Sequence, residues 1–355
     1  MAHLLCLPDE IVEALAVTSE DGVPRYDPDE RYPEPQDILT RCSSLVTTSD
    51  STYPSLWEKD DGQGPSTDTV TLVLSHFSVK EYLLSERIRN RATSRFHFTE
   101  KSANTLIAQT CLAYLQQFDS MNWPTAHKLR LSAYAARNWD VHALVVGEAS
   151  SDALRPLIMK LFHLPGYQYI NWILLHVADY CHGDISCEPW PIISPLYSAS
   201  RMGLMETTSL LLDEGADINE QTGPFDSALS AAAAGGHQAV VQMLLDRGAD
   251  VNMSLRFSGS ALQIAVKQGH LSVVQLPLDN GADVNAQGGC YGNALNAASH
   301  KHNQKAVQLL LDNGADPSTL VAAERHFKTY CGRPNQGDGN ALCAGQNRGG
   351  PSSAA

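Results

Sequence analysis

The chain has 355 residues, about twice the usual domain size, so two or more packed units are expected rather than one. Apolar residues make up 43% of the chain and charged residues 18%, which excludes wholesale disorder, collagen and coiled coil as the overall class. The formal net charge of −14 argues against nucleic acid as the partner, because neutralising phosphates requires a basic face.

Cysteine usage and hydropathy indicate the compartment. The eight cysteines show neither tight spacing nor a CxxC pair, a pattern typical of a reduced intracellular protein. The first 17 residues lack the basic n-region of a signal peptide. No apolar run approaches the roughly 18 residues that a membrane span requires. We therefore expect no membrane contact and a cytoplasmic location, with the nucleus as the other compartment left open.

Residues 1–98 are expected to combine short helices with a pair of strands. Ser78 and Glu81 form a capping box, in which hydroxyl and carboxylate satisfy the free N–H groups at a helix start. Residues 49–68 are acidic and rich in Ser, Gly and Pro, and we interpret them as a wing between two strands. In chain order, the expected elements are helices 9–18 and 35–42, strands 44–48 and 69–77, and a helix over 78–91. This order is a winged-helix arrangement.

Two segments of this region carry a resemblance. Cys42-Ser43-Ser44-Leu45-Val46 and Ser75-His76-Phe77-Ser78-Val79-Lys80-Glu81-Tyr82-Leu83 resemble the winged helix of fungal NLR-like (NACHT-ankyrin) proteins, a domain also named after GPI inositol-deacylases. The resemblance implies a module that relays nucleotide state to a repeat sensor and is not generally a DNA reader. No phosphate-binding loop G-x-x-x-x-G-K-[ST] occurs, so the NACHT NTPase is absent from this sequence. The resemblance therefore implies a paralogue, a fragment or a truncated gene model.

Residues 99–192 have a helical pattern and are expected to form a connector. One apolar face contains Ile107, Cys111, Tyr114, Leu115 and Phe118, and a second contains Leu131, Tyr134, Ala135 and Trp139. Further helices are expected over 151–163 and 167–180.

The connector also holds a possible metal-binding group, which consists of His176, Cys181, His182 and Cys187. Their Cys-x5-Cys spacing is not a usual zinc pattern, and His176 shares its helix with apolar neighbours. Buried structural residues are favoured, and we expect neither a metal nor a cofactor.

A repeat dominates the second half. Two markers recur in phase with a step of 33 residues, which is the period of a unit of two short helices and a finger. Gly-Ala-Asp begins at Gly215, Gly248, Gly281 and Gly314, and a leucine opens each unit at Leu196, Leu229, Leu262 and Leu295. Each glycine follows the last turn of a second helix, where a residue without Cβ adopts the left-handed conformation at low cost.

This half resembles the ankyrin repeat family over about 125 residues. The matching residues are Gly235-Gly236-His237, Gly269-His270 and Gly-Ala-Asp-Val-Asn at 248–252 and 281–285. The family's usual histidine after the opening leucine is replaced, so the hydrogen bonding at each finger base is expected to differ. The replacements are Tyr197, Ser230, Gln263 and Asn296. Pro277 falls inside the second helix of the third repeat, which we therefore expect to be the weakest part of the stack.

The expected fold is mostly α. A winged-helix (α+β) module over 1–98, truncated at its N-terminus, is followed by the helical connector 99–192 and an α-solenoid of about four ankyrin repeats. The expected repeats are 193–225, 226–258, 259–291 and 292–318, with a partial cap over 319–331. Residues 332–355 are Gly, Pro, Asn, Gln and Ser without periodicity and are expected to form a disordered tail.

The sequence predicts a non-enzymatic protein. No G-x-S-x-G elbow, H-E-x-x-H pair or G-x-G-x-x-G turn occurs. Solenoid surfaces bind partners in extended contact, so we expect a scaffold or sensor that binds an unidentified protein through the concave face of its repeats. The candidate partner-binding residues are Arg201, Phe225, Asp226, Arg256, Phe257, Lys267, Gln268, Tyr291, His300 and Lys301.

Three alternatives stay open. Phe257 and Tyr291 could merely pack between neighbouring fingers. The chain could instead be a regulatory subunit that acts in trans with a separate STAND/NACHT NTPase. Less favoured is nucleic-acid binding by the winged helix, which the negative charge opposes.

Overall fold

The computed structural model describes residues 17–20, 23–26, 46–51, 69–74, 99–118, 130–147, 152–163, 166–178, 193–253 and 259–322. The chain divides into two units, Met1–Trp190 and Pro191–Ala355, and each is described by itself. The helices expected over 35–42 and 78–91 and the tail expected over 332–355 lie outside the described residues.

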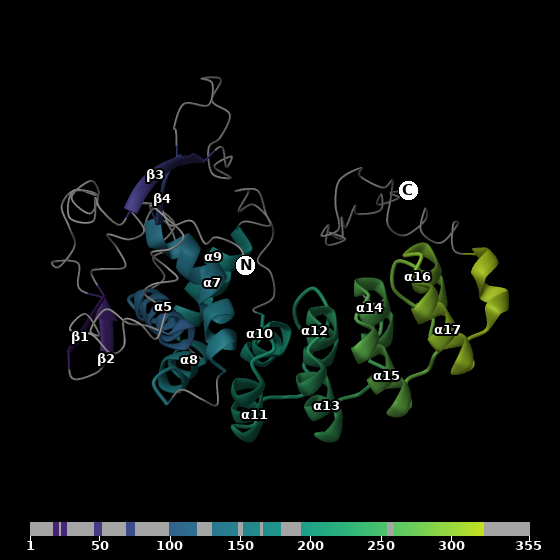
Figure 1. The fold of residues 1–355 in the computed structure, drawn as a ribbon. Coiled ribbons are helices and arrows are strands. Elements are labelled where there is room, and N and C mark those ends of the chain that lie inside the picture. Colours follow the sequence, from purple (N-terminus) through teal and green to yellow (C-terminus); the bar gives the residue numbers. More distant parts are fainter. Residues whose placement is uncertain are drawn as a thin grey trace, which may run out of the picture. The chain divides into compact units, whose positions relative to one another are not determined.

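Two antiparallel strand pairs precede the helices of the first unit (Figure 1). Strand β1 (Val17–Glu20) pairs with β2 (Val23–Tyr26), and β3 (Val46–Ser51) pairs with β4 (Thr69–Leu74). The register of the second pair runs from Val46 opposite Leu74 to Ser51 opposite Thr69. The two predicted strands are therefore confirmed in part: β3 continues beyond the predicted end at 48 into the expected wing as far as Ser51, and β4 covers 69–74 of the predicted 69–77.

The first hairpin corrects the C-terminal end of the helix predicted over 9–18, whose residues 9–16 lie outside the described residues. Val17 and Thr18 belong to β1, where Val17 faces Tyr26. The residues between β1 and β2 are Asp21 and Gly22, a pair that strongly favours a two-residue hairpin connection. At Val17 and Thr18 this turn chemistry outweighs the helical pattern. A winged-helix order does not include such a hairpin, and the winged-helix module is not confirmed.

Four helices of the first unit confirm the helical pattern predicted for the connector. They are α5 (Glu100–Leu115), α7 (Arg130–Val146), α8 (Arg155–Phe162) and α9 (Tyr167–Ala178). Helix α5 begins with a capping box in which the Ser102 N–H donates to Thr99 Oγ1 at 3.0 Å and the Thr99 N–H donates to Ser102 Oγ at 2.9 Å. Helix α5 packs against α7 and α8.

Aromatic side chains form the core of these helices. Trp139 of α7, Phe162 of α8, and Tyr169 and Trp172 of α9 are fully buried. Phe162 lies 6.1 Å from Trp139 and 5.5 Å from Trp172, measured between ring centroids. The Trp172 indole N–H donates to the Ala136 carbonyl at 3.0 Å, which satisfies its polar atom inside the core.

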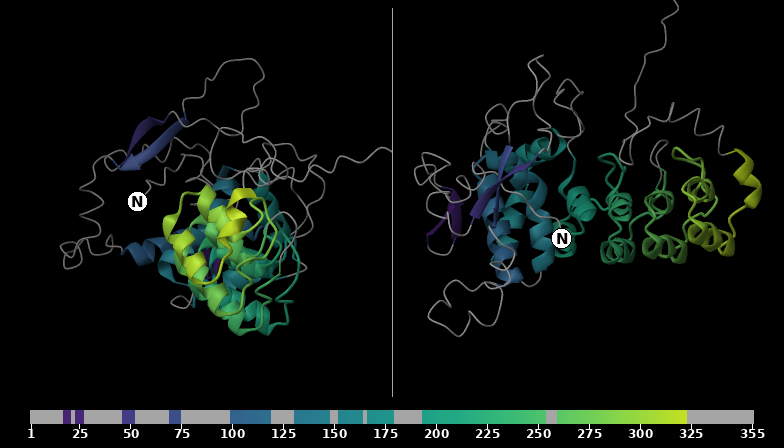
Figure 2. Two further views of the ribbon diagram at one scale, coloured as in Figure 1. Left: turned by 90° about the vertical axis from the view of Figure 1, so that its right-hand side faces the viewer. Right: turned by 45° about the horizontal axis from the view of Figure 1, so that its top comes forward.

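The second unit is a stack of helix pairs (Figures 1 and 2). In Figure 1 the first helices of the repeats form an upper row and the second helices a lower row. The first helices are α10 (Pro195–Met202), α12 (Ala228–Gly235), α14 (Ala261–Gln268) and α16 (Ala294–His300). The second helices are α11 (Met205–Asp213), α13 (Gln238–Asp246), α15 (Leu271–Asp279) and α17 (Gln304–Asp312).

The 3₁₀ helix η4 (Pro317–Ala322) follows the fourth repeat and packs against α16. It overlaps the start of the partial cap expected over 319–331, whose later residues lie outside the described part of the chain.

Each first helix begins at a buried polar cap. The capping side chains recur every 33 residues at Ser194, Ser227, Ser260 and Asn293, and all four are at least 93% buried. They accept hydrogen bonds from the N–H groups three residues later at 3.3, 3.2, 3.4 and 2.8 Å. Small residues such as Ala231–Ala234 follow and are buried, so neighbouring first helices approach closely.

One asparagine per repeat links that repeat to the next. The Oδ1 atoms of Asn219, Asn252 and Asn285 accept from the backbone N–H groups of Asp250, Asp283 and Asp316 at 2.9, 2.8 and 2.9 Å. The Nδ2 groups of Asn252 and Asn285 also donate to the carbonyls of Gly281 and Gly314 at 3.2 and 3.1 Å. We call this row of side chains the asparagine ladder. It fixes the base of each finger against the following repeat.

Pro277 occupies a core position of α15. The residues 33 positions apart in the other second helices are Leu211, Leu244 and Leu310, and all three are buried. Pro277 is also buried, but it cannot donate the helical hydrogen bond to the carbonyl of Val273.

Replacing Pro277 with leucine is expected to raise the free energy of unfolding by roughly 1–3 kcal/mol, because the helical hydrogen bond and the leucine of the other repeats are both restored. Urea unfolding of the full chain measures the change. Pro317→Leu is the control, since Pro317 is exposed at the start of η4. A Pro277→Leu variant that unfolds no later than wild type contradicts the expectation.

His302 adopts a left-handed backbone conformation with φ 54°. The equivalent residues of the other repeats are Gly203, Gly236 and Gly269, with φ of 79°, 76° and 83°. This conformation costs free energy in a residue that has a Cβ, whereas glycine adopts it without that cost.

His302→Gly is therefore expected to stabilise the repeats by about 1 kcal/mol in urea unfolding. The reciprocal variant Gly269→Ala should destabilise by a similar amount. A Cβ at Gly269 would meet no atom within 4 Å, so the backbone conformation alone carries that effect. If both substitutions leave the stability unchanged, the argument fails.

Candidate interaction surface

Eight of the ten candidate partner-binding residues are described, and we call this set the finger face. It lies at the last turns of the first helices and in the fingers, and consists of Arg201, Phe225, Asp226, Lys267, Gln268, Tyr291, His300 and Lys301. Arg256 and Phe257 lie outside the described residues. By the 33-residue period, Arg201, Lys267 and His300 occupy the same position in their first helices, and Ala234 occupies it in the second repeat. Phe225 and Tyr291 likewise occupy the same finger position, two repeats apart.

Arg201 and Phe225 lie together at the first finger. The Arg201 guanidinium carbon is 5.3 Å from the centroid of the Phe225 ring, a cation–π arrangement. The Phe225 backbone N–H donates to the Tyr197 hydroxyl at 3.2 Å. Tyr197 is buried, and this burial raises the pKa of its hydroxyl group well above the ordinary value. The backbone of Phe225 is therefore held by a buried tyrosine, and its ring is contacted by an exposed cation.

Sequence reasoning did not assign a role to Tyr197, although a residue that replaces the family's usual histidine was a signal that the position differs. Tyr197 and Gln263 both replace the usual histidine after the opening leucine. Gln263 Nε2 donates to the Ala286 carbonyl in a finger at 2.7 Å, so the two replacements bond to the fingers in different ways. The expectation that hydrogen bonding would differ between finger bases is confirmed at these two positions.

Asp226 forms part of a turn. Its φ of 71° is left-handed, and the equivalent residues in the next two fingers are Gly259 and Gly292. The Asp226 carbonyl accepts from the Thr222 N–H at 2.9 Å. The structure thus gives Asp226 a backbone role in shaping the first finger, in addition to the half-buried side chain that it presents there.

Tyr291 and His300 form a second aromatic pair. Their ring centroids are 5.0 Å apart, with Tyr291 half-buried in a finger and His300 exposed at the end of α16. Partial burial, followed by the neighbouring charges of Lys301 and His302, lowers the pKa of His300. Lys301 thus adds positive charge beside the Tyr291–His300 pair.

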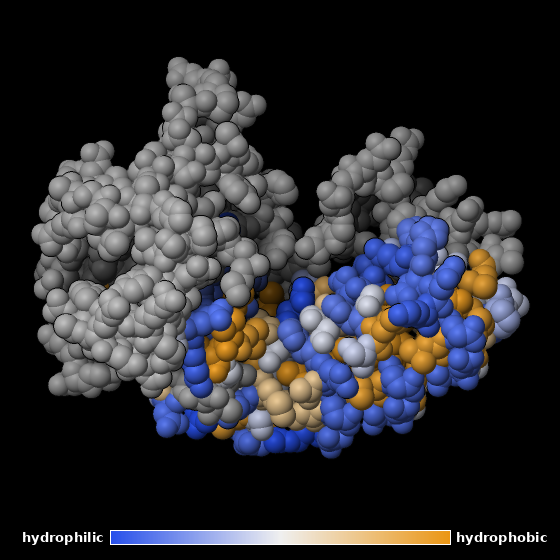
Figure 3. Space-filling model, viewed as in Figure 1, coloured by the Kyte–Doolittle hydropathy of each residue, from blue (hydrophilic) through white to orange (hydrophobic). Residues whose placement is uncertain are grey.

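Cations without salt bridges complete the finger face. Lys267 is half-buried near the end of α14, Gln268 is exposed beside it, and Lys301 is exposed at the C-cap of α16. Among the described residues, no acidic side chain forms a salt bridge with Arg201, Lys267 or Lys301. On the view in Figure 3, the described repeats carry mostly hydrophilic residues, with smaller apolar areas among them.

Two histidines fix the helix ends that carry these side chains. His237 Nε2 lies 3.1 Å from the Arg201 carbonyl oxygen, and His270 Nε2 lies 3.2 Å from the Ala234 carbonyl oxygen. Since a carbonyl only accepts, each histidine donates from Nε2. Each bond joins the start of a second helix to the last turn of the first helix in the preceding repeat, where Arg201 and Ala234 lie.

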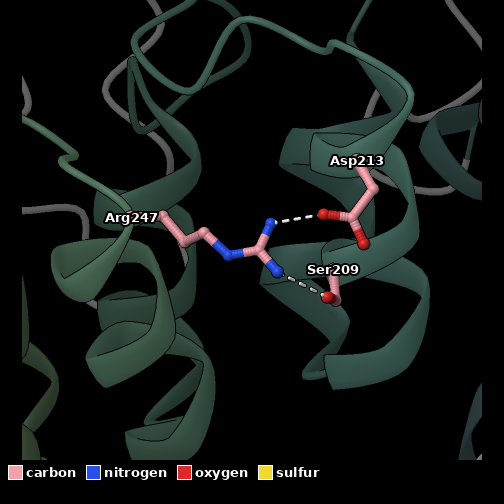
Figure 4. A network of polar contacts seen from close by, with 3 residues as sticks. All are labelled: Ser209, Asp213 and Arg247. Atoms are coloured by element: carbon pink, nitrogen blue, oxygen red, sulfur yellow. Dashed lines mark hydrogen bonds and ion pairs between the residues drawn. The ribbon is translucent and has the colours of Figure 1, made fainter.

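The second helices bear a different feature, a shallow pocket of about 480 Å³ between α11 and α13. Its lining residues are Met205, Ala239, Gln242, Met243, Asp246 and Arg247. Arg247 spans the two helices, with Nη1 at 2.7 Å from Asp213 Oδ1 and Nη2 at 3.0 Å from Ser209 Oγ (Figure 4). Sequence reasoning missed this bridge, because residues 34 and 38 positions apart meet only once the stacking of the repeats is known.

The candidate metal-binding group cannot be assembled from described residues alone. His176 lies beside Trp172, at 5.8 Å between ring centroids, and its Nδ1 is 3.3 Å from the Ala136 carbonyl oxygen. Cys181, His182 and Cys187 lie outside the described residues. In the described part of the chain, no three His, Cys, Asp or Glu side chains are grouped to hold a metal ion. In the same part, every helix is too short or too polar to cross a membrane.

Comparison with known proteins identifies the repeats. A family model described as "Ankyrin repeats (3 copies)" matches residues 170–254 and 229–320, so the C-terminal part of the chain consists of ankyrin repeats. Such repeats suggest a role in protein–protein interaction and are generally non-enzymatic. Azaphilone pigments biosynthesis cluster protein L of Monascus ruber is 34% identical over 223 residues, which is 59% of this chain and 43% of that protein. The chain thus spans less than half the length of this relative.

The burial of His237 predicts an acid-sensitive stack. Burial is the main reason why the pKa of His237 is lowered below its ordinary value of 6.5, so the folded state favours the neutral ring. The stabilisation is present above pH 6.5 and is lost as the pH falls, because the unfolded chain then binds more protons. The variant His237→Asn removes the titrating ring and introduces asparagine, which is the residue at the equivalent position of the fourth repeat, Asn303.

We expect the melting temperature of wild type to fall more between pH 7.5 and pH 5.5 than that of His237→Asn. Other titrating groups contribute equally to both proteins, so the difference isolates His237. Equal falls would show that protonation of His237 does not destabilise the stack.

Proposed function

We propose that the chain is a non-enzymatic scaffold or sensor that binds a protein partner through the finger face. The observation that carries this proposal is the pair Arg201–Phe225, in which an exposed arginine lies over a ring whose backbone is tied to buried Tyr197. The stack itself does not need the Arg201 side chain, since the caps, the asparagine ladder and His237 bond through other atoms.

Preorganised arginine and aromatic side chains are the usual anchors of protein interfaces, because little side-chain freedom is lost when a partner contacts them. Tyr291 and His300 provide a second such pair two repeats further along. Two anchored pairs at opposite ends of the finger face suit an extended partner segment that spans several repeats.

We also propose that residues 1–98 are a winged-helix-like module of the NLR-like type. The antiparallel pairing of β3 with β4 on either side of the acidic segment supports this proposal. The β1–β2 hairpin does not support it. A separate NTPase chain acting with this module is the alternative partner, and no observation among the described residues favours it over the finger face.

Affinity capture from native extract tests the finger face. The test variant combines Arg201→Ala, Phe225→Ala and Tyr291→Ala. The control variant combines Gln242→Ala, Lys305→Ala and Gln308→Ala, all on second helices. Circular dichroism and thermal unfolding establish that both variants fold. We expect wild type and the control to capture the same protein and the test variant to lose it. Equal capture by all three proteins would place recognition elsewhere.

A further inference from the structure

Charge is segregated between the two rows of helices. Residues 193–318 contain twelve acidic and six basic residues, yet the first helices α10, α12, α14 and α16 contain no Asp or Glu. Every second helix ends in an aspartate, at Asp213, Asp246, Asp279 and Asp312. Further aspartates follow in the adjoining turns at Asp217, Asp250, Asp283 and Asp316.

The cations have the opposite distribution. Three of the six basic residues, Arg201, Lys267 and Lys301, lie at the ends of first helices on the finger face. Arg247, on the second-helix side, is already paired with Asp213. Asp226 is the one acid among the eight described residues of the finger face, and it is half-buried in its turn. Among the described residues of the stack, three of the five cations thus lie on the finger face, together with a single acid.

The preorganisation of these cations bears on what they bind. A guanidinium held over the Phe225 ring keeps its planar N–H groups available for a carboxylate, which arginine binds with two parallel hydrogen bonds. Lys267 and Lys301 supply point charges further along the stack. No described acidic residue neutralises any of the three through a salt bridge, so a ligand carrying carboxylates gains these interactions on binding.

A peptide suits this surface better than a nucleic acid. The cations are separated along the stack by Ala234, and the finger face also contains Asp226. A continuous phosphate backbone requires an uninterrupted basic track and would meet the field of the many aspartates. A peptide places its carboxylates at intervals and its apolar side chains against Phe225 and Tyr291.

We infer that the finger face binds an acidic segment of the partner protein, whose carboxylates pair with Arg201, Lys267 and Lys301. This inference rests on the proposed function and adds the chemical class of the partner to it.

Fluorescence anisotropy with the full chain tests the inference. The probes are labelled twelve-residue peptides of alternating Glu and Ser, of alternating Gln and Ser, and of alternating Lys and Ser, together with a twelve-base-pair DNA duplex. We expect the Glu peptide to bind most tightly, and its affinity to fall as salt is raised from 50 to 300 mM. Equal affinity for the Glu and Gln peptides, or tighter binding of the duplex, would overturn the inference.

Lys301→Glu and Lys305→Glu form a matched pair. Both residues are exposed, and both substitutions change the charge equally, but Lys301 belongs to the finger face and Lys305 to second helix α17. We expect Lys301→Glu to weaken binding of the Glu peptide by at least about fivefold, and Lys305→Glu to change it by less than about twofold. Equal effects of the two variants would overturn the inference. Self-association of the chain that is abolished by Lys301→Glu would also overturn it, because the finger face would then bind a second copy of this chain.

The captured partner separates this inference from the proposed function. If the triple variant of Arg201, Phe225 and Tyr291 loses the partner while Lys301→Glu and added salt leave binding unchanged, the finger face is the binding surface but its ligand is not acidic. If the triple variant retains the partner, the proposed function itself fails.

Discussion

The asparagine ladder is the constraint on which the second unit depends. A single repeat cannot bury its apolar faces alone, so its structure requires a defined position of the next repeat. Asn219, Asn252 and Asn285 supply that definition, because each side chain accepts from the backbone of the following repeat at 2.8–2.9 Å. These bonds join backbone to side chain at fixed 31-residue intervals. Neighbouring fingers and first helices are thereby held in one register.

A fixed register leaves other positions free to vary. The last turn of the first helix carries Arg201, Ala234, Lys267 and His300 at equivalent places, in helices that begin at equivalent residues. The same holds for Phe225 and Tyr291 in the fingers. Binding properties can therefore be set by a few side chains, whereas the caps, the ladder and the histidine bonds maintain the stack. Segregation of charge between the helix rows is one result of this freedom.

The sequence predicted the repeats well because their determinants are local and recur with a fixed period. The structural effect of a glycine in a left-handed turn, of a capping residue or of a leucine spacing depends on only a few neighbouring residues. The Asp21-Gly22 connection was equally local and was overlooked, so the β1–β2 hairpin was missed. Contacts between repeats could not be predicted in this way. The Arg201–Phe225 pair and the Arg247 bridge depend on how the units stack, which no short pattern encodes.

Hydrogen exchange and urea unfolding of Asn252→Ala test the central role of the ladder most directly. Asn252 makes two bonds to the next repeat, to the Asp283 N–H and the Gly281 carbonyl. The control is Asn280→Ala, whose side chain bonds to Leu276 in its own helix. The ladder predicts that Asn252→Ala loses about 1–2 kcal/mol more stability than the control and that the Asp283 amide exchanges faster. Unchanged exchange at Asp283 and equal stabilities would contradict the account.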